Sequence, residues 1–114
     1  MFEISDDYGD VIIQINTKCG GQNLSIPSKF RSPVMNDPVI VLGADVTHPA
    51  AGEFSRPSIA AIVGSMDPVP CKFQATVSVQ ERRLEFIADT KDMVKKLLKR
   101  FYHKNGKKPM RVSA

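Results

Sequence analysis

The sequence contains no tryptophan and only two cysteines among its 114 residues. Cys19 and Cys71 lie far apart and lack the paired spacing of a zinc site, and because disulfides are rare inside cells we expect two reduced, half-buried thiols. No apolar run is long enough to span a bilayer, and the acidic N-terminal stretch MFEISDDYGD lacks the basic, apolar and small-residue order of a signal peptide. We therefore expect no membrane partner and a cytoplasmic location, with the nucleus as a further site.

The length allows one small domain at most. The net charge is +4 at pH 7, and eight of the 16 Lys and Arg residues lie between residues 91 and 108. Such a concentration of positive charge favours a polyanionic partner, and the simpler alternative is a solvated helix face.

The first part of the chain has the apolar spacing of an amphipathic helix. Apolar side chains recur on one face, at Tyr8, Val11, Ile12, Ile15 and Cys19. Asp6 or Asp7 can cap the start of this helix, and Gly20-Gly21 can end it. The β-branched stretch VIIQI makes a strand the alternative. Residues 22–37, rich in Pro, Asn and Ser, are expected to form a loop.

Three strands are expected next, joined by short connections. The run VIVLGA (39–44) is apolar throughout and predicts a strand buried on both faces. SIAAIVGSMD (58–67) predicts a second apolar strand. KFQATVSVQ (72–80) alternates, with its apolar residues at 73, 75, 77 and 79, and predicts a half-exposed strand.

A long helix is expected to follow the strands. Its apolar residues keep helical spacing from Leu84 through Ile87, Val94, Leu97, Leu98 and Phe101, and Asn105-Gly106 ends it. The terminal KKPMRVSA begins an extended segment. The order helix, three-stranded meander, long helix and start of a further strand predicts an α/β fold.

Individually, the candidate functional residues have ordinary explanations. Asp45 can end a strand and cap a turn, His48 can be a loop histidine, and Glu85 can oppose the dipole of a helix first turn. Their order favours a function, because a carboxylate after the first strand and another at the entry to the helix is typical of ribonuclease H-like folds. Carboxylates that converge in this way bind Mg²⁺, which prefers oxygen ligands.

Three stretches, VLGADVTHPAAGE, RPSIAAIVGSMD and ATVSVQ, resemble the PIWI domain of eukaryotic Argonaute proteins, particularly the animal subfamily. The resemblance extends from Val11 to Arg111. It implies a truncated ribonuclease H-like (PIWI) fold. It also implies that residues 1–37 are a helix and loop from the MID/PIWI junction, and that residues 38–114 are the N-terminal part of the PIWI domain.

The same resemblance implies an activity and its residues. Argonautes use a small guide RNA to select a complementary target RNA, which active members cleave with Mg²⁺ at a site of Asp, Glu, Asp and His. Asp45 matches the first Asp, and Glu85 matches the Glu of a mobile finger, so both are expected to be catalytic and metal-binding. The second Asp and the His are expected beyond Arg111, so the isolated chain is expected to be inactive.

Further residues are expected to bind RNA. Lys18 matches a lysine that binds the guide 5′ phosphate, although Gln14 replaces a second one, and the alternative for Lys18 is a favourable interaction with the helix dipole. Around the finger, Glu81 and Arg82 depart from the neutral Gln and His common in animal members. Arg82 and Arg83 are candidates for binding the nucleic-acid backbone.

The sequence therefore leaves three alternative functions open. The first is part of an RNA-guided endoribonuclease, and the second is part of a silencing protein that binds guide and target without cutting. The third is a module that binds silencing partners through their tryptophan motifs. For the third, Leu98 and Phe101 are candidates to lie near the docking surface, with ordinary core packing as the alternative.

Overall fold

The computed structural model describes residues 6–67 and 72–114, without the side chains of residues 6, 7 and 34. It divides into two compact units. The first ends at Arg31, and the second begins at Ser32. The expected cap by Asp6 or Asp7 and the thiol of Cys71 lie outside what is described.

The first unit contains the expected helix, α1 (Asp6–Lys18), followed by a short 3₁₀ turn, η1 (Ser28–Phe30). Asn23 holds the end of α1, because its side-chain amide donates to the Ile13 carbonyl at 2.9 Å and to Thr17 Oγ1 at 2.8 Å. Gly20, with φ of +84°, then turns the chain away. Cys19 is exposed, so the prediction of a half-buried thiol is wrong at this position.

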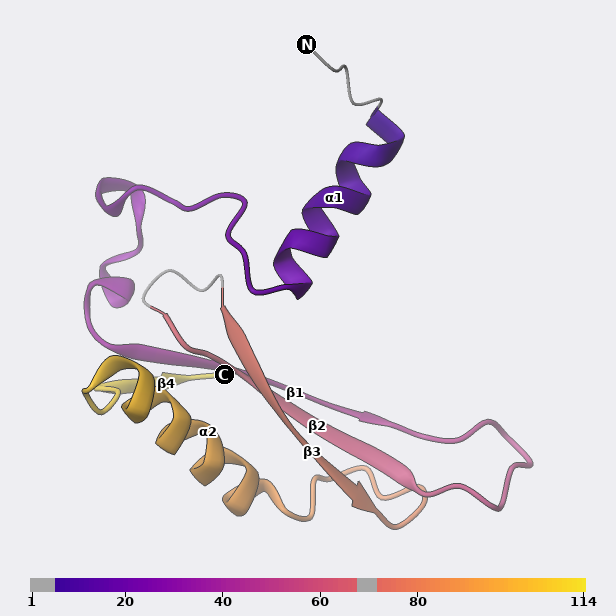
Figure 1. Cartoon of the computed structure of the whole chain (residues 1–114). Coiled ribbons are helices and arrows are strands. Elements are labelled where there is room, and N and C mark those ends of the chain that lie inside the picture. Colours follow the sequence, from indigo (N-terminus) through magenta and orange to yellow (C-terminus); the bar gives the residue numbers. More distant parts are fainter. Residues whose placement is uncertain (1–5, 68–71) are drawn as a thin grey trace. The chain divides into compact units, whose positions relative to one another are not determined.

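The second unit begins with another 3₁₀ turn, η2 (Pro33–Asn36), inside the expected loop, and then forms a four-stranded sheet. The strands are β1 (Val39–Thr47), β2 (Ser58–Ser65), β3 (Phe73–Gln80) and β4 (Arg111–Ser113), in the order β3-β2-β1-β4 (Figure 1). β1, β2 and β3 pair antiparallel, whereas β4 pairs parallel to β1. The predicted meander and the predicted further strand are both confirmed.

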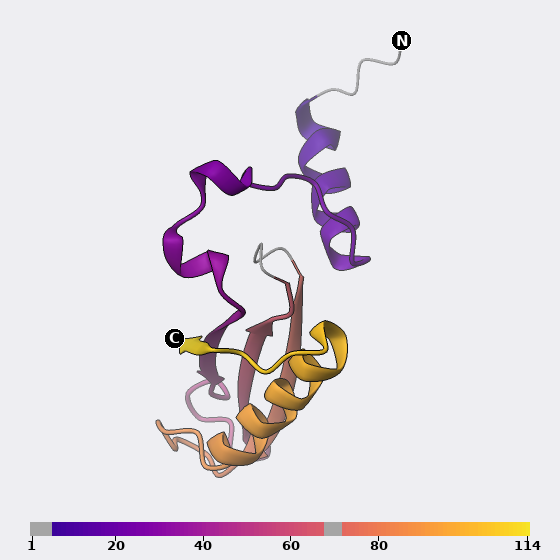
Figure 2. The same ribbon diagram turned by 90° about the vertical axis from the view of Figure 1, so that its left-hand side faces the viewer.

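The long helix, α2 (Thr90–Asn105), packs against one face of this sheet (Figure 2). The core between them is formed by buried apolar side chains of β1, β2 and α2, namely Ile40, Ile62, Met66, Met93, Leu97 and Phe101. Gly106, with φ of +66°, ends α2 as expected and donates its N–H to the Tyr102 carbonyl.

Two strand predictions need correction. β1 is buried only at Val39 and Ile40, and its later residues are partly or fully exposed because α2 covers one face of the sheet and reaches only part of its length. In β3 the buried residues are the polar Thr76 and Gln80, whereas Phe73, Val77 and Val79 are more than half exposed. The apolar side of β3 therefore belongs to the sheet face opposite α2.

The start of the long helix was also predicted too early. α2 begins at Thr90, and residues 81–89 form an irregular connection, which we call the Glu85 loop. Leu84 and Ile87 continue the helical spacing of α2 although neither is helical. Glu85 is therefore not a first-turn helix carboxylate.

Candidate metal and RNA site

Asp45 lies on β1, two residues before the strand ends at Thr47. Opposite it in the antiparallel register is Ala61, and both belong to the sheet face that α2 leaves uncovered. The side chain is exposed, and Oδ1 accepts a 2.9 Å hydrogen bond from the Val46 N–H. Because the strand continues past Asp45, its explanation as a simple strand-ending turn cap is wrong.

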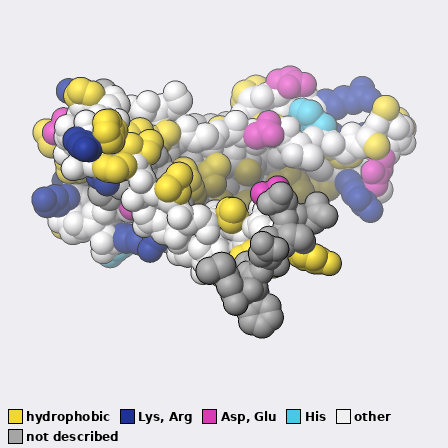
Figure 3. All heavy atoms as spheres, turned by 90° about the horizontal axis from the view of Figure 1, so that it is seen from above, with side chains coloured by type: hydrophobic (Ala, Val, Ile, Leu, Met, Phe, Trp, Pro, Cys, Tyr) yellow, Lys and Arg dark blue, Asp and Glu magenta, His cyan; other side chains and the backbone are white. Residues whose placement is uncertain are grey.

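Glu85 projects from the Glu85 loop with its side chain 87% exposed. Its nearest charged or titratable partner is His48, whose Nε2 lies 3.6 Å from Glu85 Oε1. The β1–β2 connection and the Glu85 loop leave the same end of the sheet, because Thr47 pairs with Ile59 and Ser58 pairs with Gln80. Figure 3 shows acidic side chains close to a histidine at this end of the sheet, which lies on the right in Figures 1 and 3.

Two buried polar side chains of the sheet form hydrogen bonds to His48 and to the Glu85 loop. Ser58 Oγ lies 2.7 Å from His48 Nδ1 and accepts the Arg83 N–H at 3.2 Å. The Gln80 amide bonds the Glu85 loop at three points, the Leu84 and Phe86 carbonyls and the Ala88 N–H. Unlike His48, which the sequence offered as a candidate with a loop histidine as its simpler explanation, Ser58 and Gln80 are functional candidates that the sequence did not single out. Their only sequence signal is a polar residue in an apolar strand.

The two arginines of the Glu85 loop differ in their surroundings. Arg82 Nη1 donates to the Phe54 carbonyl at 2.7 Å, and its guanidinium lies 4.6 Å from the centre of the Phe54 ring. Arg83 has an exposed side chain and a φ of 60°, which is rare for a residue other than glycine. Arg82 is therefore committed to a protein contact, whereas the Arg83 side chain faces solvent.

Lys18 lies in the last turn of α1 and is exposed. Gln14, one helical turn earlier, is exposed too. The position of Lys18 is compatible both with phosphate binding and with the simpler interaction with the helix dipole.

The carboxylates of Asp45 and Glu85 have the chemistry of Mg²⁺ ligands, because both offer exposed oxygens. Within residues 6–67 and 72–114, no three His, Cys, Asp or Glu side chains are grouped closely enough to hold a metal. These two carboxylates can thus supply part of a metal site.

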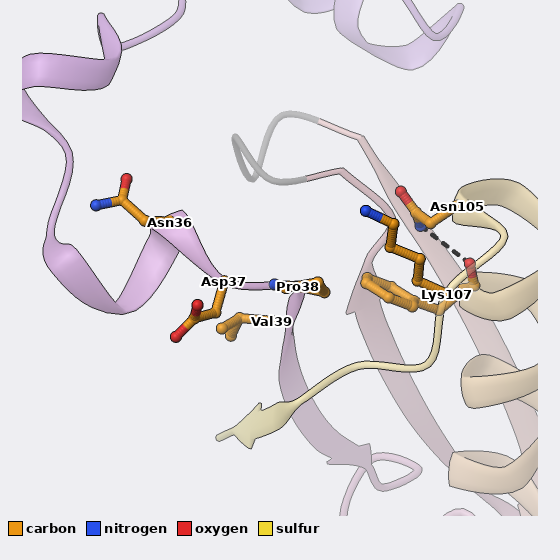
Figure 4. Close-up of a pocket in the computed structure, with 7 residues that line it drawn as sticks. Asn36, Asp37, Pro38, Val39, Asn105 and Lys107 are labelled. Atoms are coloured by element: carbon orange, nitrogen blue, oxygen red, sulfur yellow. Dashed lines mark hydrogen bonds between the residues drawn. The ribbon is translucent and has the colours of Figure 1, made fainter.

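Hollows formed by described residues also lie on the surface of the second unit, away from these carboxylates, and two of them are of interest. The larger, about 550 Å³, lies between α2 and the segment leading to β4, and we call it the Leu98 groove; its lining includes Leu98, Tyr102, Lys108, Pro109 and Val112. The smaller, about 260 Å³, lies where β1 begins, beside Pro38, Val39 and Lys107 (Figure 4). Phe101 is only 2% exposed and belongs to the core, so of the two residues considered for partner docking only Leu98 reaches the Leu98 groove.

Comparison with known proteins identifies the family. The model of the Piwi domain matches residues 8–113. The chain belongs to the Piwi domain family. The expected resemblance and the ribonuclease H-like (PIWI) fold class are therefore confirmed.

Solved structures agree with this membership. Argonaute of Kluyveromyces polysporus, solved with a guide RNA, is 31% identical over 91% of this chain and 12% of that chain, with a TM-score of 0.74. The MID-PIWI domains of N. crassa QDE-2 are 27% identical over 93% of this chain and 31% of that chain, with a TM-score of 0.72. Drosophila Piwi, at 21% identity and a TM-score of 0.67, shares the fold. The Piwi chain thus spans less than a third of the length of these relatives.

In the part of the chain that the structure describes, no helix is long and apolar enough to cross a membrane.

Proposed function

We propose that this Piwi chain forms part of a protein that binds a small guide RNA and silences complementary RNA by Mg²⁺-dependent cleavage. The observation that carries the proposal is the position of Asp45. It presents an exposed carboxylate from a central strand, at the end of the sheet from which the Glu85 loop also leaves. A strand holds its carboxylate rigidly, as a metal ligand requires, whereas a loop allows the second carboxylate to approach.

In this proposal Asp45 and Glu85 bind Mg²⁺ together with ligands from the rest of the protein. When bound, Mg²⁺ activates water and stabilises the leaving oxygen of a phosphodiester. The hydrogen bond from the Val46 N–H orients the Asp45 carboxylate, and His48 holds the Glu85 carboxylate at the edge of the sheet.

The guide and target backbones are assigned to basic residues. Lys18 binds the guide 5′ phosphate as a point charge at the end of α1. Arg83 offers an exposed guanidinium to backbone phosphates, while Arg82 contributes less because Phe54 already engages it. Residues 1–37 are assigned to the MID/PIWI junction and residues 38–114 to the PIWI domain, in a protein of the cytoplasm and also the nucleus.

The test is cleavage of a labelled, guide-matched target RNA with Mg²⁺. The 114-residue chain, the full-length protein and its Asp45→Ala and Glu85→Gln variants are compared, with Asp67→Ala as a control carboxylate at the opposite end of β2. We expect cleavage only by the full-length protein and the control variant, and nearly unchanged guide binding by the full-length variants. Guide-dependent cleavage by the isolated chain, or by the Asp45→Ala protein, refutes the proposal.

A second candidate function is silencing without cleavage, through partners with tryptophan motifs. The Leu98 groove supports it, because an apolar floor of Leu98, Pro109 and Val112 is bordered by Lys95, Lys99 and Lys108. An indole ring fits such a floor, and ammonium groups attract both its face and acidic residues beside it.

A binding measurement separates this second function from the first. A tryptophan-containing acidic peptide is titrated into the full-length protein and into its Leu98→Ser variant, with Lys96→Ser as a control exposed on the same helix. At least ten-fold weaker binding by Leu98→Ser alone supports the docking function. Equal affinities exclude the Leu98 groove.

A further inference from the structure

Ser58 and Gln80 form a buried polar pair across two strands. They face each other in the register of β2 and β3, on the same face as the apolar core, and are 0% and 8% exposed. A side chain at such a position is ordinarily apolar, because a buried hydroxyl or amide without partners is strongly destabilising. The partners of this pair therefore show what it does.

Among the described residues, every hydrogen bond of the Gln80 side chain goes to the Glu85 loop. Nε2 donates to the Leu84 carbonyl at 2.9 Å and to the Phe86 carbonyl at 3.0 Å, while Oε1 accepts the Ala88 N–H at 3.3 Å. Leu84 and Phe86 are the two residues that flank Glu85. The Gln80 side-chain amide thus binds the backbone on both sides of Glu85, the residue that carries the exposed carboxylate.

Ser58 holds the first part of the same loop and its neighbour. Its Oγ accepts the Arg83 N–H, and its own proton has His48 Nδ1 as the acceptor at 2.7 Å among the described residues. A buried hydroxyl proton needs an acceptor, so this arrangement leaves Nδ1 of a neutral His48 unprotonated and puts the ring proton on Nε2. Nε2 is the atom that faces Glu85.

We propose that Ser58 and Gln80 are positioning residues, which together hold the Glu85 loop in place and set the His48 tautomer, so that Glu85 is presented for metal binding. The inference rests on the proposed function for the role of Glu85. The restraint of the loop, which we call the clamp, rests on the four hydrogen bonds that Ser58 and Gln80 make to the loop backbone. A loop that passes through a positive φ at Arg83 needs such restraint, because left-handed backbone is unfavourable for an L residue.

The clamp is tested by hydrogen exchange, resolved to single amides, in the guide-free full-length protein. In the wild type we expect the amides of Arg83 and Ala88 to exchange at least ten-fold more slowly than those of Glu85 and Phe86, which have no acceptor among the described residues. Similar rates at all four amides overturn the clamp, and this comparison does not depend on any variant folding.

Variants then assign the restraint to side chains. Gln80→Met keeps the volume and removes the bonds, and we expect it to accelerate exchange at Ala88 at least ten-fold, while Ser58→Ala does so at Arg83. The matched controls, Gln74→Met on the same strand and Ser55→Ala in the β1–β2 connection, are exposed and should leave both amides unchanged. For the tautomer, ¹⁵N shifts should show Nδ1 unprotonated and Nε2 protonated in wild-type His48, and Ser58→Ala should remove this preference.

Cleavage kinetics connect the clamp to Glu85. We expect Gln80→Met to lower the single-turnover cleavage rate at least ten-fold with unchanged guide and target affinity, and to cause no further loss in a Glu85→Ala background. A further loss there means that Gln80 does not act through Glu85. If the wild type does not cleave at all, the proposed function fails, but the exchange pattern still decides whether the clamp exists.

Discussion

His48 Nε2 lies 3.6 Å from Glu85 Oε1, although the two residues belong to different connections of the sheet. The distance is slightly long for a direct hydrogen bond, and the Glu85 side chain is 87% exposed. The contact therefore orients the carboxylate without burying it, and Glu85 keeps free oxygen atoms for a metal ion.

This geometry limits the effect of changing His48. An exposed pair of this kind is worth roughly 0.2–1 kcal/mol. In the full-length protein, His48→Ala should therefore lower the rate of guide-directed cleavage by about 1.4–5-fold, since a change of 1.4 kcal/mol alters a rate ten-fold. Glu85→Ala should be far more damaging, and single-turnover rates compare the two. Equal losses for both variants contradict a merely orienting role for His48.

Replacing Lys18 should weaken guide retention and leave the chemistry of cleavage intact. Removing a point charge from the 5′ phosphate weakens charge-assisted binding. We expect Lys18→Ala to raise the dissociation rate of a 5′-phosphorylated guide and to leave that of a 5′-hydroxyl guide unchanged. The control is Lys29→Ala, a second exposed lysine of the same unit. Equal effects on both guides indicate that Lys18 interacts only with its helix.

The basic surface of α2 should contribute little to RNA affinity. Lys95, Lys96 and Lys99 are exposed on the helix side opposite the buried Met93, Leu97 and Phe101. Neutralising all three to Gln should change the slope of log K against log salt by less than about 1, which corresponds to about one lost phosphate contact. A slope change near 3 shows instead that each lysine binds a phosphate.

Gly64 should be needed for the close approach of the sheet and α2. A Cβ added there would lie 3.1 Å from Leu42 Cδ2, 3.3 Å from Ile40 Cδ1 and 3.5 Å from Leu97 Cδ1. Gly64→Ala should lower the free energy of unfolding by about 1–3 kcal/mol because the core is overpacked. Gly43→Ala is the matched control, since its nearest neighbour would be 3.9 Å away. Denaturant unfolding compares them, and equal stabilities contradict the packing argument.

The isolated 114-residue chain should be less stable than a longer piece of the same protein. Ile59, Val63, Phe73, Val77 and Val79 leave an apolar sheet face exposed opposite α2. A segment that covers this face adds burial worth about 25 cal/mol per Å². In thermal melts we expect a lower and broader transition for the isolated chain. Identical melts mean that the exposed face needs no cover.

Much of the fold follows from periodicity, and the errors have physical causes. Alternation along β3 correctly predicted a strand, but alternation does not tell which face meets the helix, and Gln80 is buried because the Glu85 loop satisfies its amide. Leu84 and Ile87 keep helical spacing without being helical because hydrogen bonds to Gln80 hold this backbone in another form.

The candidate site was predictable only in part, for the same kind of reason. Asp45 is recognisable in the sequence because it is a carboxylate that directly follows an apolar run. The approach of His48 and Ser58 to the Glu85 loop depends on how two connections meet at one end of the sheet, and no local pattern encodes this.

The parallel pairing of β1 with β4 has a consequence for the order of folding. β1 can form a hairpin with β2, and β2 with β3, as soon as these strands are synthesised. The other edge of β1 stays unpaired until β4, which follows the whole of α2, has emerged from the ribosome. Synthesis proceeds at roughly 5–20 residues per second, so this edge stays open for about a second or more and is able to pair with other chains. We therefore expect the nascent chain to need a chaperone at this stage, with the β1 edge as the segment to be shielded.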